Sequence, residues 1–439
     1  MTTPSHSAEP QRLAYLESIR GLAAVQVVLL HFFSAFWPDL VFESVNHGVA
    51  WYVHLSPLYF LYDGHSAVYI FFVLSGYVLS RSFERHLEHP LALILARALR
   101  LGLPAVAAVL VGAAAIGIIG RPNVDASAIS GSEWFASPHF TELSMLSIVR
   151  DGVANALFLG YRGWPGVAFL SPWQQPISQS FVPPLWSLSI EFYGSLAILL
   201  LSWCERRSRP LWWVAMILAT IFTIRSAYLC FVVGHLLANW LRAEKPAPAS
   251  PLLPTMAVAL GVFLCVRADV WQFEWLRRLC SEPTFWLFPG QSAAQQQKAL
   301  GAIFILIGLI HLQWVRSALS WPWLVKKSRL SFPIYLMHWP ILFGPAALIF
   351  LWLSGVIGLE LARIGAIVAG ISIAFVGALL FSPIDRGALS LSRRWRERLS
   401  GMTMQTTALR HAVVAPRAVP AERTGPVSVL PNLDRSAAA

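Results

Sequence analysis

The chain has 439 residues, of which 56% are hydrophobic and only 13% are charged, whereas about 25% charged residues are usual in soluble domains. The formal net charge is +11, yet the basic residues gather in short segments between long apolar runs, as at 204–210, at 316–329 and after 386. This is the pattern of a membrane protein that follows the positive-inside rule. It argues against a nucleic-acid-binding protein and against a string of soluble domains.

Residues 1–12 are polar and show no signal-peptide pattern, so we expect a short cytoplasmic N-terminal segment. The four cysteines share no CxxC spacing, which predicts neither a metal site nor a redox site.

Ten apolar segments follow one another along the chain, and runs of about 20 apolar residues are candidate membrane spans. They cover residues 13–37, 58–80, 93–120, 180–203, 211–224, 226–241, 252–268, 298–315, 330–353 and 360–381. The fifth and sixth are short and only Arg225 separates them, so one long helix is an alternative. Ten spans place every basic loop in the cytoplasm, whereas merging these two would put 316–329 outside. The sequence therefore predicts an all-α, polytopic integral membrane helical bundle of about ten transmembrane helices, with both termini cytoplasmic.

Three regions follow from this topology. A cytoplasmic N-terminal segment covers 1–12, a transmembrane domain covers 13–385, and a cytoplasmic tail covers 386–439. The tail begins basic and becomes rich in Ala, Pro and Thr without periodicity, which predicts disorder after about residue 400. In the outer stretch 121–179, residues 147–160 have the pattern of a short re-entrant or surface helix.

The first apolar segment carries Arg20 near its cytoplasmic end and His31 toward the outside. Eleven residues at about 100° each make three turns plus about 20°, so both side chains share one helix face, about 16.5 Å apart along the axis. Ala24 and Val27 lie between them on that face and would line a narrow passage. A charged residue in a membrane helix costs about 2.5–3.5 kcal/mol, which favours a functional pair: an anionic ligand at the arginine and a reacting centre at the histidine. The alternatives are a snorkelling arginine and a core histidine bonded to a carbonyl.

The second and third segments carry further polar groups. Ser75 and Gly76 allow close approach of two helices, and no nucleophile-elbow pattern surrounds Ser75. Arg97 and Arg100 share one face near the cytoplasmic end of the third segment. Two guanidinium groups held together favour a multivalent anion such as phosphate. Ordinary flanking charge is the alternative.

Glu191 lies in the middle of the fourth segment, where a lone carboxylate needs a partner or a task. It can pair with Arg20, orient His31 or accept a substrate hydroxyl, and a purely structural ion pair is the alternative. His338 lies in the ninth segment. Aromatic residues expected on the outer side suit either sugar stacking or anchoring at the membrane interface, and these are Tyr161, Trp164, Trp173 and Trp186.

Five stretches resemble the signatures of membrane acyltransferase family 3, whose members O-acylate sugars and related molecules in bacteria. In chain order they are LESIRGLAAVQVVLLHF (16–32), FFVLSGYVL (71–79), RALR (97–100), LWSLSIEFYGSL (185–196) and SFPIYLMHWPI (331–341). Together the resemblance covers about residues 13–385. The chain departs from the family where many members carry a Glu-Glu-Gln-Phe-Tyr run, since Glu191 stands alone here, and at Pro333, where Ser-Tyr is common. The C-terminal periplasmic esterase-like domain of some members is not seen in this sequence.

The resemblance implies a membrane O-acyltransferase of the bacterial inner membrane. It would move an acyl group, commonly acetyl, from cytoplasmic acyl-CoA to a hydroxyl of a carbohydrate such as an exopolysaccharide or an O-antigen. The pantetheine arm would run past Ala24 and Val27 so that the thioester reaches His31, which would act as general base or as acyl carrier. No metal is implied. The identity of the acceptor and the oligomeric state stay open.

The family motifs also suggest roles for the other polar residues. Arg20 and Glu191 would organise the site around His31, Arg20 by stabilising negative charge or by pairing with Glu17 or Glu191. Arg97 and Arg100 would hold the phosphates of acyl-CoA. Substrate-binding or structural roles fall to Ser75, Gly76, Trp186 and His338.

A secondary transporter is the alternative function, because histidine and glutamate inside a membrane suit a proton relay. The sequence shows neither an inverted repeat nor paired broken helices, which argues against a transporter. A scaffold protein without chemistry would leave the five motifs unexplained.

Overall fold

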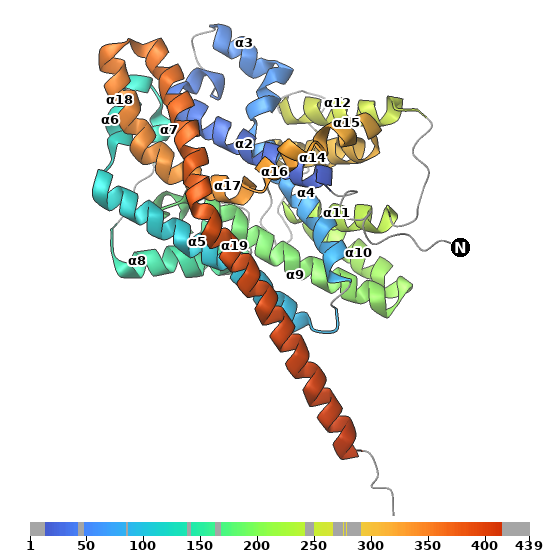
Figure 1. The fold of residues 1–439 in the computed structure, drawn as a ribbon. Helices are drawn as coiled ribbons and strands as arrows, with labels where there is room; N and C mark the ends of the chain where they lie inside the picture. Colours follow the sequence, from blue (N-terminus) through green and yellow to red (C-terminus); the bar gives the residue numbers. More distant parts are fainter. Residues whose placement is uncertain are drawn as a thin grey trace, which may run out of the picture.

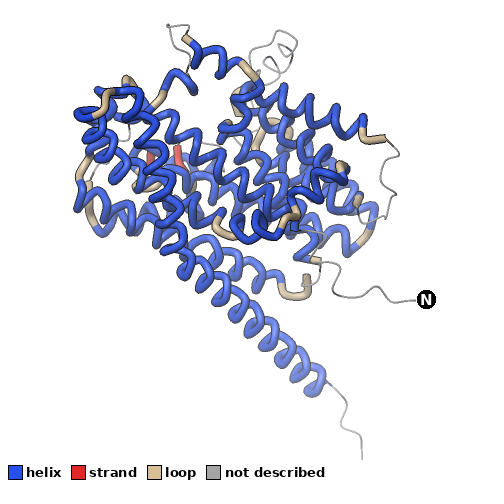
Figure 2. Tube along the Cα trace, turned by 45° about the horizontal axis from the view of Figure 1, so that its top comes forward, coloured by secondary structure: helices blue, strands red, loops and turns tan. Residues whose placement is uncertain are grey.

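The computed structural model describes residues 14–42, 48–84, 87–137, 142–162, 168–241, 250–266, 275, 278 and 291–414. Within these ranges the chain is almost entirely helical, and the exception is a parallel pair of two-residue strands, β1 (Tyr161–Arg162) and β2 (Gln175–Pro176) (Figure 2). The prediction of an all-α polytopic membrane protein is confirmed.

Seven helical units of the described chain are long and apolar enough to cross a bilayer. They are α2 (Ala14–Phe36), α4 (Gly64–Phe83), α5 (Pro90–Ile119), η6 with α9 (Pro183–Leu185 and Trp186–Arg207), α14 (Ala293–His311), α17 with η8 and α18 (Ser331–Ile341, Leu342–Ala346 and Ala347–Val356), and α19 (Leu359–Val414). Figure 1 shows α19 crossing the whole bundle and continuing beyond it. Each unit coincides with a predicted apolar segment.

Shorter apolar helices occupy the other three predicted segments: α10 (Arg209–Thr223), α11 (Tyr228–Trp240) and α12 (Leu252–Val266). Because α10 and α11 are separate helices, the alternative of one long helix through Arg225 is wrong. The number of membrane crossings made by these three helices stays a prediction.

The remaining helices are short and connect these units. They are η1 (Pro38–Leu40), α3 (Val49–Leu55), η2 (Pro57–Tyr62), α6 (Pro122–Ser130), α7 (Glu133–Ala136), α8 (Met145–Val149), η3 (Arg150–Leu159), η4 (Ala168–Trp173), η5 (Ile177–Gln179), α15 (Gln313–Leu319) and α16 (Pro322–Ser328).

Local sequence signals set several helix ends. Ser208 precedes α10 and its hydroxyl accepts the backbone N–H of Leu211, as expected of an N-cap. Ser292 and Gln295 form a capping box at the start of α14. α5 ends at Gly120, whose φ of 80° lies in the region that favours glycine.

The connection between α5 and α9 contains helices α8 and η3 where the sequence predicted a short helix. α8 leads into the π-helix η3, which packs against α5 and α9. Asp151 in η3 is buried and accepts hydrogen bonds from the Tyr161 hydroxyl (2.7 Å), the Gln175 side-chain amide (2.7 Å) and the Phe181 backbone N–H (2.8 Å). The carboxylate therefore ties η3 to the segment that returns toward α9. Tyr161 is consequently a core residue, and its predicted role as a sugar platform or interface anchor is wrong.

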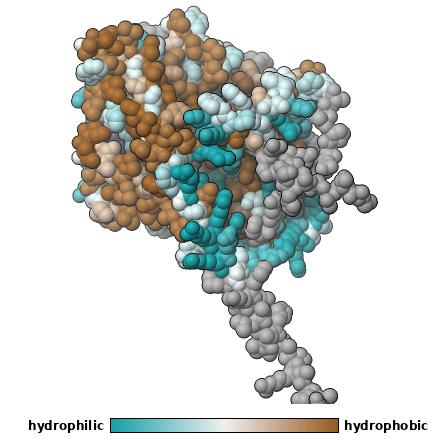
Figure 3. Space-filling view, in the orientation of Figure 1, coloured by the Kyte–Doolittle hydropathy of each residue, from teal (hydrophilic) through white to brown (hydrophobic). Residues whose placement is uncertain are grey.

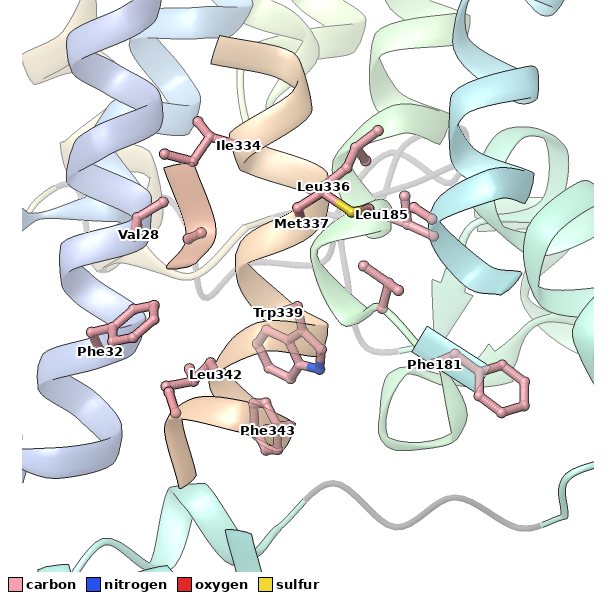
Figure 4. Packing of buried hydrophobic residues seen from close by; sticks show 14 of the residues in the cluster. Val28, Phe32, Phe181, Leu185, Ile334, Leu336, Met337, Trp339, Leu342 and Phe343 are labelled. Atoms are coloured by element: carbon pink, nitrogen blue, oxygen red, sulfur yellow. The ribbon is translucent and has the colours of Figure 1, made fainter. Parts of the chain in front are cut away.

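The buried hydrophobic residues form two large cores. The first is built mainly from α5, α17 and α19, and Val28 and Phe32 of α2 pack into it beside Trp339 and Leu342 (Figure 4). The second is built mainly from α4, α11 and α14, with Leu16 of α2. α2 and α9 each contribute more than one residue to both cores, and α5 adds Leu93 to the second. α2 and α9 therefore lie along the seam between the two cores.

The surface fits a membrane protein in which lipid replaces water around the middle of the bundle. The face in Figure 3 is largely hydrophobic, and hydrophilic side chains gather near the place where α19 leaves the rest of the molecule. α19 continues as helix through Val414, although the sequence predicted disorder after about residue 400. The rest of that predicted tail, 415–439, lies outside the described residues.

Candidate active site

α2, α4, α9 and α17 enclose a cavity of about 50 Å³. From α2 it is lined by Arg20, Ala24 and Val27, so the predicted shared face does line a passage as far as Val27. Glu191 of α9 contributes a second ionisable side chain to the wall. His31 is not part of the lining. Since it follows Val27 by four residues, it lies about one helical turn beyond the end of the cavity.

His31 meets His338 at this position. The distance from His31 Nδ1 to His338 Nε2 is 3.1 Å, and the ring centroids lie 5.1 Å apart. His338 is fully buried, and its Nδ1 lies 3.3 Å from the carbonyl oxygen of Ile334. Three residues before His338, Tyr335 lines the cavity. The structure thus places a pair of histidines, rather than one, about one helical turn beyond the end of the cavity.

Two tryptophans frame His31. Trp134 of α7 stacks on its ring at a centroid distance of 5.6 Å and an interplanar angle of 16°. Trp339 of α17 meets the ring edge-on at 5.3 Å and 82°. Trp134 belongs to the connection between α5 and α9, so part of this connection packs against the histidine. The sequence analysis did not single out Trp134, since nothing in its local pattern distinguishes it from an interface aromatic residue.

Arg20 does not pair with Glu191. Its Nη1 lies 3.2 Å from the Glu17 carboxylate, and its guanidinium lies 5.7 Å from the centre of the Phe71 ring. Its buried Nε has no hydrogen-bond partner among the described residues. Of the two predicted carboxylate partners, Glu17 is therefore the one that the structure shows. Nε of Arg20 is therefore available to donate a hydrogen bond to a bound ligand.

Arg97 of α5 pairs with Glu191 of α9 instead. One Nη of Arg97 contacts Glu191 Oε1, and Nε of Arg97 donates to the hydroxyl of Ser195, one turn further along α9, at 2.8 Å. The second carboxylate oxygen, Oε2, is buried without a hydrogen-bond partner among the described residues. Glu191 therefore has an ion-pair partner and one open acceptor.

Arg100 has a separate carboxylate partner, Asp385 of α19, and its guanidinium lies 5.2 Å from the Phe332 ring. The sequence analysis treated Arg97 and Arg100 as one clamp. In the structure each arginine is neutralised by its own carboxylate. The carboxylates belong to two different helices, α9 and α19, because Arg97 and Arg100 face different neighbours around α5. Anion binding by the two arginines stays a prediction.

These features identify a charged cavity that leads to a histidine pair inside a helical membrane bundle. The sequence model of a family described as an acyltransferase domain matches residues 13–383, which is most of the chain. The chain belongs to acyltransferase family 3. Comparisons with the curated proteins and with the solved structures found no significant match. The protein is thus a multi-pass membrane acyltransferase.

Other predicted site residues of this acyltransferase make contacts that do not involve the two histidines. A Cβ on Gly76 of α4 would come within 2.4 Å of the Phe231 carbonyl oxygen of α11, so glycine is needed for this close helix contact. Ser75 is buried, and its hydroxyl has no partner among the described residues. Trp186, the first residue of α9, meets Phe72 edge-on.

The acyltransferase also contains a buried ion pair that the sequence analysis missed. Lys298 of α14 donates from Nζ to Asp63 Oδ2 at 2.6 Å and to the Cys265 carbonyl oxygen at 2.8 Å. Asp63 also caps α4. The signal was a single lysine at the start of an apolar segment, whose partner cannot be read from the sequence. The pair links the start of α4 to the first turns of α14.

Within the described part of the acyltransferase, no group of three or more His, Cys, Asp or Glu side chains is arranged to hold a metal ion. Glu191 pairs with Arg97 rather than with either histidine. The described contacts therefore do not connect the glutamate to the histidines as a proton relay would require.

Proposed function

We propose that this acyltransferase moves an acyl group, most simply acetyl, from cytoplasmic acyl-CoA to a hydroxyl of a carbohydrate acceptor, with His31 as the reacting group. The observation that carries the proposal is the cavity itself, which begins at Arg20 and ends one turn from His31. A thioester on a long thin arm suits such a passage. The rest of the proposal follows the chain from the cytoplasmic end of the cavity to the histidine pair.

At the cytoplasmic end, the phosphates of coenzyme A need cationic partners. Arg20 offers a donor without a partner, and Arg97 and Arg100 lie nearby on α5. Both α5 arginines are about four-fifths buried and carry carboxylate partners, so phosphate binding requires them to share or exchange those partners. The donor therefore binds in competition with Glu191 and Asp385.

The cavity of about 50 Å³ is smaller than a whole pantetheine arm. Binding of the donor thus requires α2, α4, α9 and α17 to separate slightly. Apart from Arg20 and Glu191, the lining consists of apolar side chains, two serines and Tyr335, which suits the mostly apolar arm.

At His31 two routes are open. In general base catalysis, His31 accepts the proton of the acceptor hydroxyl as its oxygen attacks the thioester carbonyl. In covalent catalysis, His31 attacks first and an acyl-histidine passes the acyl group to the hydroxyl. Both routes release the thiol of coenzyme A.

We place the protein in the bacterial inner membrane with both termini in the cytoplasm, as the distribution of Arg and Lys favours. The donor then enters from the cytoplasm, and the acceptor comes from the outer side, where Trp134 and Trp339 surround His31. A transporter gains no support, because the family is one of acyltransferases.

The test compares cells that produce the wild-type protein with cells that produce His31→Ala, and measures ester-linked acetyl on their polysaccharide by mild alkaline release. We expect a loss of about 10²–10⁴-fold, the usual worth of a general base. His311→Ala is the matched control, since His311 bonds its own helix carbonyl at the end of α14. Full acylation by His31→Ala would refute the role of His31. Solute accumulation without any acyl ester would favour the transporter.

A further inference from the structure

We propose that His338 is a positioning residue that fixes the tautomer of His31, so that Nε2 of His31 is the reacting nitrogen. The inference rests on the proposed function for its chemistry, but the tautomer itself follows from the hydrogen bonds alone. It gives a task to a histidine that the motif analysis left as substrate-binding or structural.

The carbonyl oxygen of Ile334 can only accept a hydrogen bond, and it lies 3.3 Å from Nδ1 of His338. Nδ1 of His338 must therefore carry the hydrogen. A neutral imidazole has one N–H, so Nε2 of His338 is left with a lone pair and accepts.

Nε2 of His338 faces Nδ1 of His31 at 3.1 Å. Since one of the two nitrogens must donate and His338 accepts, Nδ1 of His31 carries the hydrogen. The lone pair of neutral His31 then lies on Nε2, on the side of the ring away from His338. The chain from the carbonyl to the reacting nitrogen is thus Ile334, His338 and His31.

The competing assignments are costly. If Nε2 of His338 carried the hydrogen, a neutral His338 would point the lone pair of Nδ1 at the lone pairs of the Ile334 carbonyl. If both nitrogens carried hydrogens, the ring would be a cation in a fully buried position. Among the described residues no carboxylate forms an ion pair with His338, so nothing there offsets that charge.

The surrounding rings keep this geometry. Trp134 stacks on the face of His31, and Trp339 meets it edge-on. Turning the ring over would put Cδ2 in the place of Nδ1 and Cε1 in the place of Nε2, and the rings packed against His31 oppose that rotation. The protein therefore fixes both the orientation and the protonation pattern of His31.

Either route needs a lone pair on Nε2. As base, Nε2 takes the hydroxyl proton, the new C–O bond forms, the C–S bond breaks, and the departing thiolate of coenzyme A recovers the proton. As nucleophile, Nε2 forms a C–N bond while the thiolate leaves, and the acceptor oxygen then displaces the imidazole and its proton goes to the thiolate. In both cases positive charge appears on His31, and the Nδ1–H bond to His338 strengthens.

The test reads the tautomer directly. Protein labelled with ¹⁵N-histidine in nanodiscs is examined by long-range ¹H–¹⁵N NMR, and His31 is assigned by the signals lost in His31→Ala. We expect a protonated Nδ1 and a bare Nε2 on His31. A protonated Nε2 in the wild type would overturn the proposal, whether or not acyl transfer is observed. The NMR experiment can therefore reject the proposed tautomer without rejecting the proposed function, and the activity assay can do the reverse.

Two variants test the role of the acceptor. His338→Gln keeps an acceptor oxygen near the position of Nε2, whereas His338→Leu removes it. We expect His338→Leu to lose the fixed tautomer and to lower kcat about 10- to 100-fold, as loss of an orienting partner typically does, with little change in KM for the donor. His338→Gln should restore the tautomer and most of kcat, with His311→Gln as the control. Equal activity of the Leu and Gln variants would overturn the positioning role.

Discussion

Arg97 of α5 and Glu191 of α9 form a buried ion pair on the wall of the cavity, across a separation of 94 residues in the sequence. The pair links α5 to α9. Each charge neutralises the other, whereas either charge alone would be costly to bury inside the membrane. The guanidinium of Arg97 explains how the carboxylate of Glu191, in the second turn of α9, is tolerated inside the bundle. The Ser195 hydroxyl accepts a hydrogen bond from Nε of the same arginine.

Breaking this pair should destabilise the protein more than replacing it. Arg97→Met or Glu191→Leu alone leaves an unpaired buried charge, which typically costs about 3–5 kcal/mol. The double variant Arg97→Met with Glu191→Leu should recover most of the thermal stability in detergent but not the acyl transfer. Single variants that melt at the wild-type temperature would show that water or lipid headgroups already screen the pair.

The Arg100–Asp385 pair predicts an effect on donor affinity. If phosphate competes with the carboxylate, Asp385→Asn frees Arg100 and should lower KM for acetyl-CoA, whereas Arg100→Ala should raise it. Arg100→Lys should rescue only partly, because an ammonium does not reproduce the planar fork of arginine. Steady-state kinetics over a range of acetyl-CoA concentrations decide this. Unchanged KM in all three variants would return Arg100 to a structural role.

Because α4 and α11 pack closely at Gly76, we expect a larger residue at this position to lower the stability of the protein. An alanine there would place its Cβ within 2.4 Å of the Phe231 carbonyl oxygen, so the helices must move apart, at a cost of about 1–3 kcal/mol. Gly355→Ala on α18 is the matched control, since its Cβ would meet nothing within 4 Å and the change favours helix. Thermal unfolding in detergent should show a lower midpoint for the first variant and an equal or higher one for the second.

The predicted topology can be checked by labelling single cysteines at exposed positions with a membrane-impermeant reagent. Ile129→Cys should be labelled from outside, and Arg207→Cys and Lys327→Cys only after the membrane is opened. The background lacks the four native cysteines, of which Cys204, Cys230 and Cys265 are buried. Labelling of position 207 or 327 in intact cells would contradict the cytoplasmic placement of the basic loops.

The sequence allowed prediction of the helical segments, because apolar runs and basic loops report directly on transfer from water to lipid. It also predicted that Arg20, Ala24 and Val27 share one face, which depends only on helical periodicity. The sequence did not allow prediction of which polar residues pair with one another. Arg97 with Glu191, Arg100 with Asp385 and His31 with His338 are separated by 94, 285 and 307 residues, and no local pattern states which distant helices pack together.

The end of α19 shows another limit. Composition after residue 400 lacks apolar periodicity, yet the helix continues to Val414. A helix that is already nucleated adds residues at little cost, so a weak segment can follow a strong one. The lack of apolar periodicity therefore did not report on the helical backbone.

The division of the bundle into two cores has a consequence for how substrates enter. The cavity lies at the seam, between α4 of one core and α17 of the other, with α2 and α9 along its sides. Packed helices slide past one another by small shear displacements without loss of backbone hydrogen bonds. A slight slide of one half against the other would therefore widen the passage while each half stays folded. The two halves of the enzyme would then move as rigid bodies, and the catalytic histidines would lie near the seam between them.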